Sequence, residues 1–250
     1  MGVAPFFYVL VFPFFKEMGE TDMKLDARLE AVRAFVPAGG VVADIGTDHG
    51  YLAAALVQSG QAERVIASDL NLGPCEAARR TVREEQLKDA VEVRQGDGLT
   101  VLVPGEVQTA CIAGMGGALM VSILAAAPLV VKKLDALVLQ PMNGAYELRH
   151  YLYQHGWHVA DETLVVADDR IYTVLRAEKG RCKMPDALTL EIGPVLWERK
   201  PELLRHHIES LLFQARRAAA GMEKSERAKQ SAKYKDIQKR IKALEERLIW

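Results

Sequence analysis

Apolar and polar positions alternate along the first two thirds of the chain in a pattern that predicts strands followed by helices. Short, continuously apolar runs indicate buried strands, and apolar residues at every third or fourth position indicate helices. The expected strands are Val41–Ile45, Arg64–Ser68, Val91–Arg94, Thr109–Ala113 and Leu134–Leu139, and the expected helices are Leu25–Val36, Tyr51–Gln58, Pro74–Glu85, Ala118–Ala126 and Tyr146–His155. Five strand–helix alternations predict an α/β fold with a parallel sheet covered on both faces.

Two further strands follow without a helix between them. They are Trp157–Ala167 and Arg170–Ala177, joined tightly at Asp168 and Asp169. Such neighbours form an antiparallel hairpin. A mostly parallel seven-stranded sheet that ends in an antiparallel hairpin resembles the Rossmann-like fold of class I methyltransferases and differs from plain dinucleotide-binding folds.

The character of the sequence changes after Gly180. Apolar residues recur at helical spacing in two charged segments: Leu204, Ile208, Leu211 and Ala215, then Ile237, Ile241, Leu244 and Leu248. This spacing predicts two helices that form an antiparallel coiled-coil hairpin. We therefore expect a cofactor-binding domain at residues 23–180 and a C-terminal coiled-coil domain at residues 181–250.

The first 22 residues do not fit this plan. Residues 2–15 are apolar and aromatic, but they lack the positive region and small-residue cleavage site of a signal peptide. No apolar run reaches the roughly 18 residues that a membrane span needs, so no membrane partner is expected. Met23 is a plausible start, and we expect residues 1–22 to be a disordered or spurious extension.

Charge is distributed unevenly although the net charge is only −1. Residues 199–250 hold 14 basic against 7 acidic side chains, and the rest of the chain is acidic. A basic tail on an acidic body favours nucleic-acid contact. The three cysteines are isolated, which indicates a reduced, cytoplasmic protein without a metal site. His206 and His207 are adjacent, so they cannot share a metal, and we expect both on the surface.

Glycines and acids follow the predicted strands at the edge where open α/β sheets bind ligands. In the segment Asp44-Ile45-Gly46-Thr47-Asp48-His49-Gly50, Gly46 allows close approach of a ligand to the backbone, and the next helix offers its N-terminal dipole. Asp48 stands where a pyrophosphate would require a small neutral residue. A carboxylate there repels phosphate but tolerates a sulfonium and an ammonium group, which favours a methyltransferase over a dinucleotide-binding protein.

Two more acids follow the second and third strands. Asp69 could accept hydrogen bonds from both ribose hydroxyls of a nucleoside, or it could cap the next helix. Asp97, next to Gly98, could accept the adenine amino group, or it could be an ordinary turn residue. His49 could contact the ligand or could be structural.

Three motifs resemble the TrmK family, the bacterial tRNA (adenine-N1)-methyltransferases that modify adenosine 22. The motifs are Ala43-Asp44-Ile45-Gly46-Thr47-Asp48-His49-Gly50-Tyr51-Leu52, Arg94-Gln95-Gly96-Asp97-Gly98-Leu99 and Ile112-Ala113-Gly114-Met115-Gly116-Gly117, and Leu139-Gln140-Pro141 accompanies them. The resemblance extends from about Met23 to the C-terminus, since that family also ends in a coiled coil. It implies S-adenosylmethionine as cofactor and tRNA as partner. The sequence leaves the oligomeric state open and is compatible with a monomer.

The resemblance also implies roles for single residues. The implied cofactor contacts, together with those expected from strand-end position, are Asp44, Gly46, Asp48, His49, Asp69, Asp97, Gly98 and Gly114. Gln140 and the loop that contains Met115 would shape the adenine pocket, which makes Gln140 and Met115 candidate catalytic residues. Asp48 is the third candidate, because its carboxylate could stabilise the positive charge of a methylated base. Methyltransferases of small molecules or proteins, and a non-catalytic RNA-binding protein of the same fold, remain alternatives.

Overall fold

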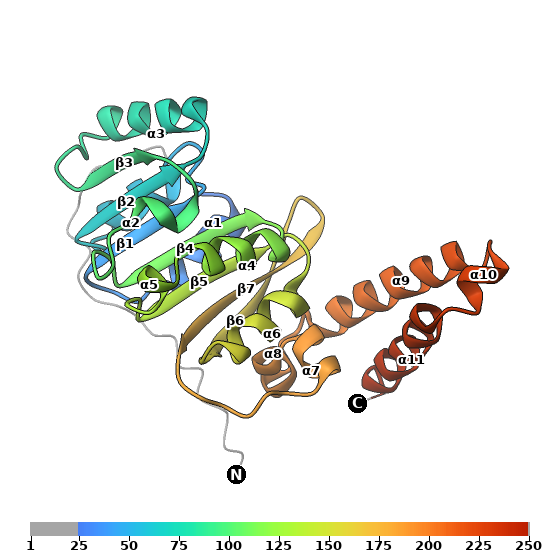
Figure 1. The fold of residues 1–250 in the computed structure, drawn as a ribbon. Helices are drawn as coiled ribbons and strands as arrows, with labels where there is room; N and C mark the ends of the chain where they lie inside the picture. Colours follow the sequence, from blue (N-terminus) through green and yellow to red (C-terminus); the bar gives the residue numbers. More distant parts are fainter. Residues whose placement is uncertain (1–24, 250) are drawn as a thin grey trace, which may run out of the picture.

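A computed structural model describes residues 25–249, and the predicted extension at residues 1–22 lies outside this range. The core is a single seven-stranded sheet in the order β3-β2-β1-β4-β5-β7-β6 (Figure 1). Its strands are β1 Val41–Ile45, β2 Arg64–Asp69, β3 Val91–Gln95, β4 Thr109–Met115, β5 Ala136–Pro141, β6 Trp157–Ala167 and β7 Arg170–Lys179. The strands β1 to β5 pair in parallel, and β7 pairs antiparallel with both β5 and β6. This topology confirms the predicted methyltransferase-like fold.

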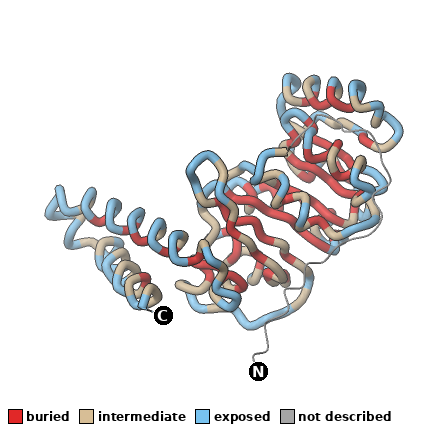
Figure 2. Tube along the Cα trace, turned by 180° about the vertical axis from the view of Figure 1, so that it is seen from behind, coloured by how far each residue is buried: buried red, intermediate tan, exposed pale blue. Residues whose placement is uncertain are grey.

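Helices cover both faces of the sheet, because successive strand residues point to opposite sides. One face packs against α1 Ala27–Phe35, α2 Tyr51–Gln58 and α3 Leu72–Glu84, and the other against the 3-10 helix η1 Gly98–Val101, α4 Gly117–Ala126, α5 Pro128–Val131 and α6 Ala145–Gln154. In β1, Val42 lies in the core on the side of α1, α2 and α3, whereas Ala43 and Ile45 lie in the core on the side of α4, α5 and α6. The central strands are therefore buried on both sides, as Figure 2 shows in red.

The strands β4 and β5 differ from the sequence-based prediction close to the candidate site. The strand β4 continues to Met115, past Gly114, because a bulge between Ala113 and Met115 and a φ of +76° at Gly114 keep the chain paired with β5. The strand β5 begins at Ala136 rather than Leu134 and extends to Pro141. The extensions to Met115 and Pro141 carry both strands further toward the edge that holds the candidate site.

The C-terminal region contains more helices than predicted. Between β7 and the expected hairpin lie α7 Ala187–Ile192 and α8 Pro194–Arg199, and the hairpin consists of α9 Leu204–Met222, α10 Glu226–Lys229 and α11 Ala232–Arg247. The helix α9 extends away from the sheet, and α11 runs back alongside α9 (Figure 1). The helical hairpin is thus confirmed, whereas coiled-coil packing and the domain boundaries at 22/23 and 180/181 stay predictions.

A third apolar cluster joins this hairpin to the sheet. It consists of Leu164, Ile192, Leu196, Leu204, Ile208, Leu212, Ala215 and Leu244. Because Leu164 belongs to β6 and Leu244 to α11, the hairpin shares a core with the last strands. Within residues 25–249, no helix is long and apolar enough to cross a membrane.

Candidate active site

Backbone hydrogen bonds join the loops that follow the parallel strands into one continuous edge. The N–H groups of Gly46 and Thr47 both donate to the carbonyl of Ser68, at 2.8 and 2.9 Å, and Gly96 N–H donates to the carbonyl of Asp69 at 2.9 Å. These bonds fix the loops after β1, β2 and β3 relative to one another. The candidate residues of three separate motifs therefore lie along one side of the sheet.

The loops after β4 and β5 are joined in the same way. The N–H of Met142 donates to the carbonyl of Met115, and the N–H of Gly117 donates to the carbonyl of Asn143, each at 2.8 Å. Any side chain at Gly117 would overlap the carbonyl oxygen of Gly144. The glycines of the Gly114–Gly117 motif therefore allow two strand-end loops to pack directly on each other.

Asp44 is buried beneath the first loop. Its carboxylate accepts a hydrogen bond from the Thr47 hydroxyl at 2.6 Å, which holds the turn closed. Burial raises the pKa of the Asp44 carboxyl from its usual 3.8 to about 6, although the Thr47 hydrogen bond opposes this shift. Asp44 therefore supports the loop from below, and its carboxyl loses its proton about two pH units higher than an exposed aspartate does.

Asp48 and His49 lie on the solvent side of the same loop. Asp48 has a φ of +51°, an uncommon conformation for a residue with a side chain, and its side chain is 73% exposed. The His49 ring stacks on Tyr51, with centroids 5.3 Å apart, and its Nε2 atom lies 3.8 Å from Asp48 Oδ1. The turn thus presents a carboxylate and an imidazole next to each other at the open edge.

The structure argues against a helix-capping role for Asp69. The N-terminal cap of α3 is Asn71, whose own side chain makes no capping hydrogen bond. Asp69 instead accepts a hydrogen bond from the N–H of Asn71 at 2.9 Å. Asp97 precedes η1 without capping it by its side chain. Neither carboxylate caps a helix, but Asp69 holds the turn that leads into α3 and Asp97 stands in the turn before η1, so its alternative as a turn residue stays open.

Met115 connects the two halves of the edge. Its terminal methyl group packs on the Cα of Gly46 so closely that a Cβ at position 46 would overlap it. The loop after β1 and the end of β4 are therefore in direct contact, and a residue predicted for the adenine pocket touches one predicted for the cofactor.

Gln140 lies at the end of β5 and is completely buried. Its Oε1 atom accepts hydrogen bonds from the Gly114 N–H at 3.0 Å and from Arg28 Nη1 at 2.9 Å. Its Nε2 atom lies 3.7 Å from the sulfur of Met142. The structure thus brings together Gly114, Met115 and Gln140, as the motifs indicated, and adds Arg28 from α1. Nothing in the local sequence distinguishes Arg28 from Arg33 on the same helix, so only the tertiary fold reveals it.

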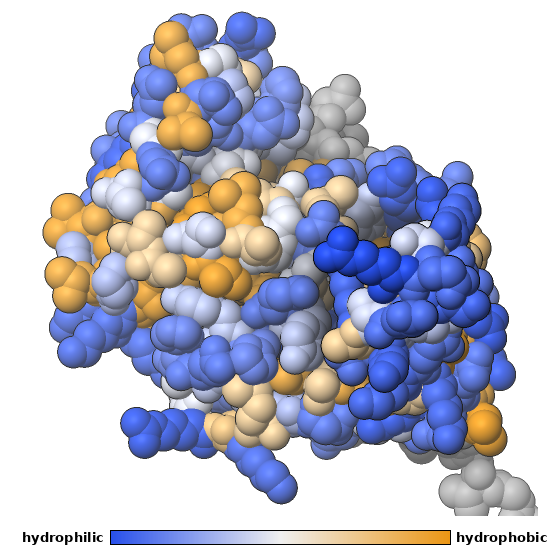
Figure 3. Space-filling view, turned by 45° about the vertical axis from the view of Figure 1, so that its right-hand side comes forward, coloured by the Kyte–Doolittle hydropathy of each residue, from blue (hydrophilic) through white to orange (hydrophobic). Residues whose placement is uncertain are grey.

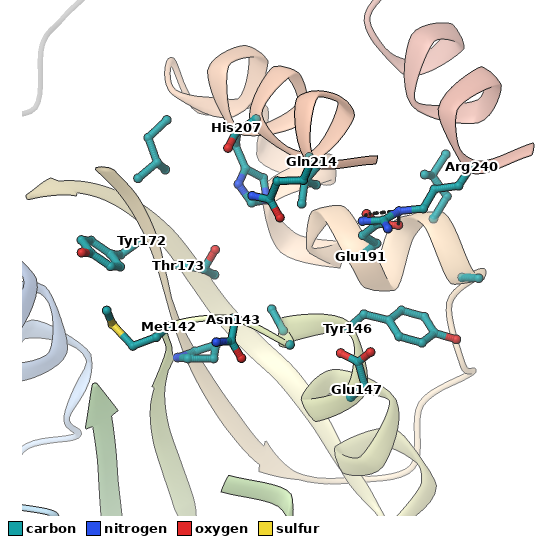
Figure 4. A pocket seen from close by; sticks show the side chains of 18 of the residues that line it. Met142, Asn143, Tyr146, Glu147, Tyr172, Thr173, Glu191, His207, Gln214 and Arg240 are labelled. Atoms are coloured by element: carbon teal, nitrogen blue, oxygen red, sulfur yellow. Dashed lines mark hydrogen bonds and ion pairs between the residues drawn. The ribbon is translucent and has the colours of Figure 1, made fainter. Parts of the chain in front are cut away.

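A cleft of about 680 Å³ opens beside this edge, between the loop after β5 and the C-terminal helices. Met142, Asn143 and Tyr172 line one side, and His207 and Gln214 of α9 face them from the other (Figure 4). On the same wall as α9, Arg240 of α11 is paired with Glu191 of α7. The sequence did not reveal this cleft, since its walls come from segments up to about a hundred residues apart.

The prediction that His206 and His207 both lie on the surface is wrong for His207. His206 is exposed as expected, but His207 is half-buried at the cleft wall, and its Nε2 atom lies 3.0 Å from the carbonyl of Ile192. Burial, reinforced by the charge of Arg149, lowers the pKa of His207 to about 4. The ring is therefore neutral at physiological pH. Within the described range, no group of three or more His, Cys, Asp or Glu side chains could hold a metal ion.

The sheet order and the strand-end carboxylates define the class of protein, and comparison with known sequences agrees. Residues 25–175 match the methyltransferase domain family, to which the chain belongs. It is 34% identical over 232 residues to the tRNA (adenine(22)-N(1))-methyltransferase of Bacillus subtilis (strain 168), covering 88% of this chain and 98% of that relative. The chain thus belongs to the family of tRNA (adenine(22)-N(1))-methyltransferases, which confirms the resemblance indicated by its motifs.

Solved structures agree with this assignment. The crystal structure of the B. subtilis m1A22 tRNA methyltransferase TrmK has a TM-score of 0.82 at 33% identity, covering 90% of this chain and 99% of that one. Streptococcus pneumoniae Sp1610 in complex with S-adenosyl-L-methionine has a TM-score of 0.80 at 29% identity, covering 90% and 100%. The similarity therefore includes the C-terminal hairpin as well as the sheet.

Proposed function

We propose that this protein transfers a methyl group from S-adenosylmethionine to N1 of an adenosine in tRNA, at the position equivalent to adenosine 22. Family membership supports the proposal, because the B. subtilis relative is named for this reaction. The observation that carries it is the continuous edge formed by the five strand-end loops, which places Gly46, Met115 and Gln140 side by side.

The residues along β1 to β3 fit S-adenosylmethionine. Gly46 has no side chain, so a ligand could approach its Cα closely if the flexible end of Met115, which packs against it, moves aside. Asp69 would accept the ribose hydroxyls, and Asp97 beside Gly98 would accept the adenine amino group. The carboxylate of Asp48 would favour the positive charges of the amino acid part, with His49 beside it.

The residues along β4 and β5 would hold the acceptor. N1 lies on the Watson–Crick edge of adenine, so the target nucleotide must be unpaired or flipped out, at a cost of a few kcal/mol. The cofactor supplies a methyl group activated by its positively charged sulfur. The protein then acts through positioning and electrostatics. Met115 and Gln140 would place the base, and Asp48 would stabilise the positive charge that develops on it.

The C-terminal hairpin would bind the tRNA backbone. Hydrophilic side chains predominate on the right-hand part of the face in Figure 3, where this hairpin lies. Its excess of basic residues favours phosphate. Because the proposed substrate is tRNA, we propose that the protein acts in the cytoplasm.

The test is methylation of bulk tRNA with labelled cofactor, followed by mapping of reverse-transcription stops. N1-methyladenosine blocks pairing, so we expect one new stop at the target adenosine. Reaction with proteins or small molecules but not with tRNA would support the alternative methyltransferases. A folded protein that binds the cofactor and leaves tRNA unlabelled would overturn the proposal.

A further inference from the structure

The side-chain amide of Gln140 is held in one orientation by two groups that can only donate hydrogen bonds. The Gly114 N–H and the Arg28 guanidinium both point at the same atom, at 3.0 and 2.9 Å. Neither can accept a hydrogen bond, so only the amide oxygen can occupy this place. Rotating the amide by 180° would set its N–H groups against two donors in a fully buried position.

The nitrogen side of the amide faces Met142. With the oxygen saturated, Nε2 is the polar atom that remains, and its partner among the described residues is the thioether of Met142 at 3.7 Å. A thioether is a weak acceptor. Met142 lines the cleft beside the strand-end loops and is itself exposed. The N–H groups of Gln140 thus lie behind a flexible side chain that a bound base could displace.

Arg28 is well placed to maintain this orientation. It lies on α1, on the other side of the strand ends, and its guanidinium is also 3.5 Å from the carboxylate of Asp26. The arginine is therefore fixed between an acid at the start of its own helix and the amide oxygen. A planar guanidinium with several donors can make both contacts at once.

We propose that Arg28 is a positioning residue that makes Gln140 a hydrogen-bond donor toward the acceptor nucleoside. This inference rests on the function proposed above and deepens it. Adenine presents ring nitrogens as acceptors and its exocyclic amine as a donor. A donating Gln140 recognises a ring nitrogen other than the one that receives the methyl group, and it does not accept the exocyclic amine.

The substitution Gln140→Glu separates the two possible roles. A glutamate oxygen still accepts from Gly114 and pairs with Arg28, so the fold of the edge is retained, but the N–H donor is lost. We expect kcat/KM for tRNA to fall on the order of a hundredfold, with cofactor affinity unchanged. If Gln140 instead accepted the exocyclic amine, Gln140→Glu would keep or raise the rate, and that result would overturn the proposal.

The second arm of the test is Arg28→Met, with Arg33→Met as the matched control. Arg33 lies on the same helix but pairs with Glu30 and Gln61, away from the site. We expect Arg28→Met to lower kcat/KM for tRNA about tenfold, as for the removal of one hydrogen bond, with partial rescue in Arg28→Lys. Equal effects of Arg28→Met and Arg33→Met would show that Arg28 only supports the helix.

A measurement without turnover keeps the inference separate from the proposed function. NMR of nitrogen-labelled protein should show the side-chain amide protons of Gln140 as one sharp, slowly exchanging pair, which broadens in Arg28→Met and stays sharp in Arg33→Met. An unchanged signal in Arg28→Met would contradict the positioning role. Absence of tRNA methylation in the wild-type protein would instead count against the proposed function alone.

Discussion

Arg149 and Glu162 form an ion pair in which both side chains are completely buried, with Nε and Oε1 2.6 Å apart. Arg149 also donates to the carbonyl of Leu190 at 2.8 Å, and the second oxygen of Glu162 accepts from the N–H of Val195 at 3.0 Å. The pair thus joins α6 and β6 to α7 and α8, and it fixes the base of the C-terminal hairpin on the sheet.

Replacing one member of this pair should destabilise the protein strongly. Arg149→Met leaves a carboxylate buried without its partner, so we expect the free energy of unfolding in urea to fall by about 3–5 kcal/mol. The double variant Arg149→Met/Glu162→Leu removes both charges and should recover part of this loss. A single variant as stable as the wild type would show that the ion pair is dispensable.

The raised pKa of Asp44 predicts a pH-dependent stability. Because the folded-state pKa of about 6 lies above the usual 3.8, folding favours the protonated carboxyl. This contribution is fully present below about pH 4 and is lost as the pH rises through 6. Asp44→Asn should therefore be more stable than the wild type at pH 7.5, by up to about 3 kcal/mol, and the difference should vanish near pH 4.

Urea unfolding of both proteins between pH 4 and pH 7.5 measures this difference. The control is Asp89→Asn, since Asp89 is exposed in the turn before β3. An equal effect of the two substitutions, or a constant difference for Asp44→Asn at every pH, would contradict the assignment.

The contact between Gly46 and Met115 predicts a cofactor-specific defect. Gly46→Ala places a side chain at a φ of +74°, and Gly60→Ala does the same at +69° where nothing lies within 4 Å. Both variants should lose about 1–2 kcal/mol of stability from the backbone conformation. Calorimetry should show weaker S-adenosylmethionine binding for Gly46→Ala only. Normal cofactor affinity in Gly46→Ala would place the cofactor elsewhere.

Asp48 tests the catalytic assignment. Asparagine tolerates the left-handed backbone of this position, so Asp48→Asn should fold normally. If the carboxylate stabilises charge on the base, turnover should fall on the order of a hundredfold. If it only binds the ammonium group, the KM for the cofactor should rise while turnover at saturation is spared. Single-turnover rates at saturating cofactor and tRNA distinguish these results, and a near-normal rate would reject the catalytic role.

The hairpin tip offers a test of tRNA binding that keeps the fold intact. Deleting the hairpin would expose Leu164, which packs with α9. Replacing four exposed basic residues at the tip by glutamine keeps this apolar contact intact. The four residues are Lys224, Arg227, Lys233 and Lys235. Each phosphate that the variant no longer neutralises should reduce the slope of log affinity against log salt by about 0.9.

The control for the tip variant removes the same kind of charge far from the hairpin. The control substitutions are Lys88→Gln and Lys133→Gln. These exposed lysines precede β3 and β5, at the amino-terminal ends of the strands, opposite the candidate site. Cofactor affinity should stay constant in both variants. If filter binding shows the same salt slope for the tip variant as for the wild type, the hairpin does not contact phosphate.

The sequence predicted the sheet well because the strands have local signatures: each of β1 to β4 ends in or is followed by glycine or an acid, and β5 contains a continuous apolar run. It predicted the helices α7 and α8 poorly, since Pro185, Gly193, Pro194 and Pro201 interrupt any periodic pattern there. For the candidate site, strand-end position pointed to Gly46 and Asp69, whereas Gln140 was indicated by the family resemblance. The contacts of Arg28 with Gln140 and of His207 with the carbonyl of Ile192 depend on packing between distant segments, which no local pattern encodes.

The length of the hairpin sets the distance between its basic tip and the strand-end loops. The helix α9 has 19 residues and so extends about 28 Å from its base beside the cleft. The shared core around Leu204 and Ile208 holds that base against the sheet, so the spacing between the basic tip and the strand-end loops is built into the fold. If the hairpin binds the tRNA backbone as proposed, an RNA gains both contacts only when its backbone lies that far from the exposed adenosine. Substrate choice would then depend on the three-dimensional breadth of a folded RNA, and a short oligonucleotide of identical sequence would be a poor substrate.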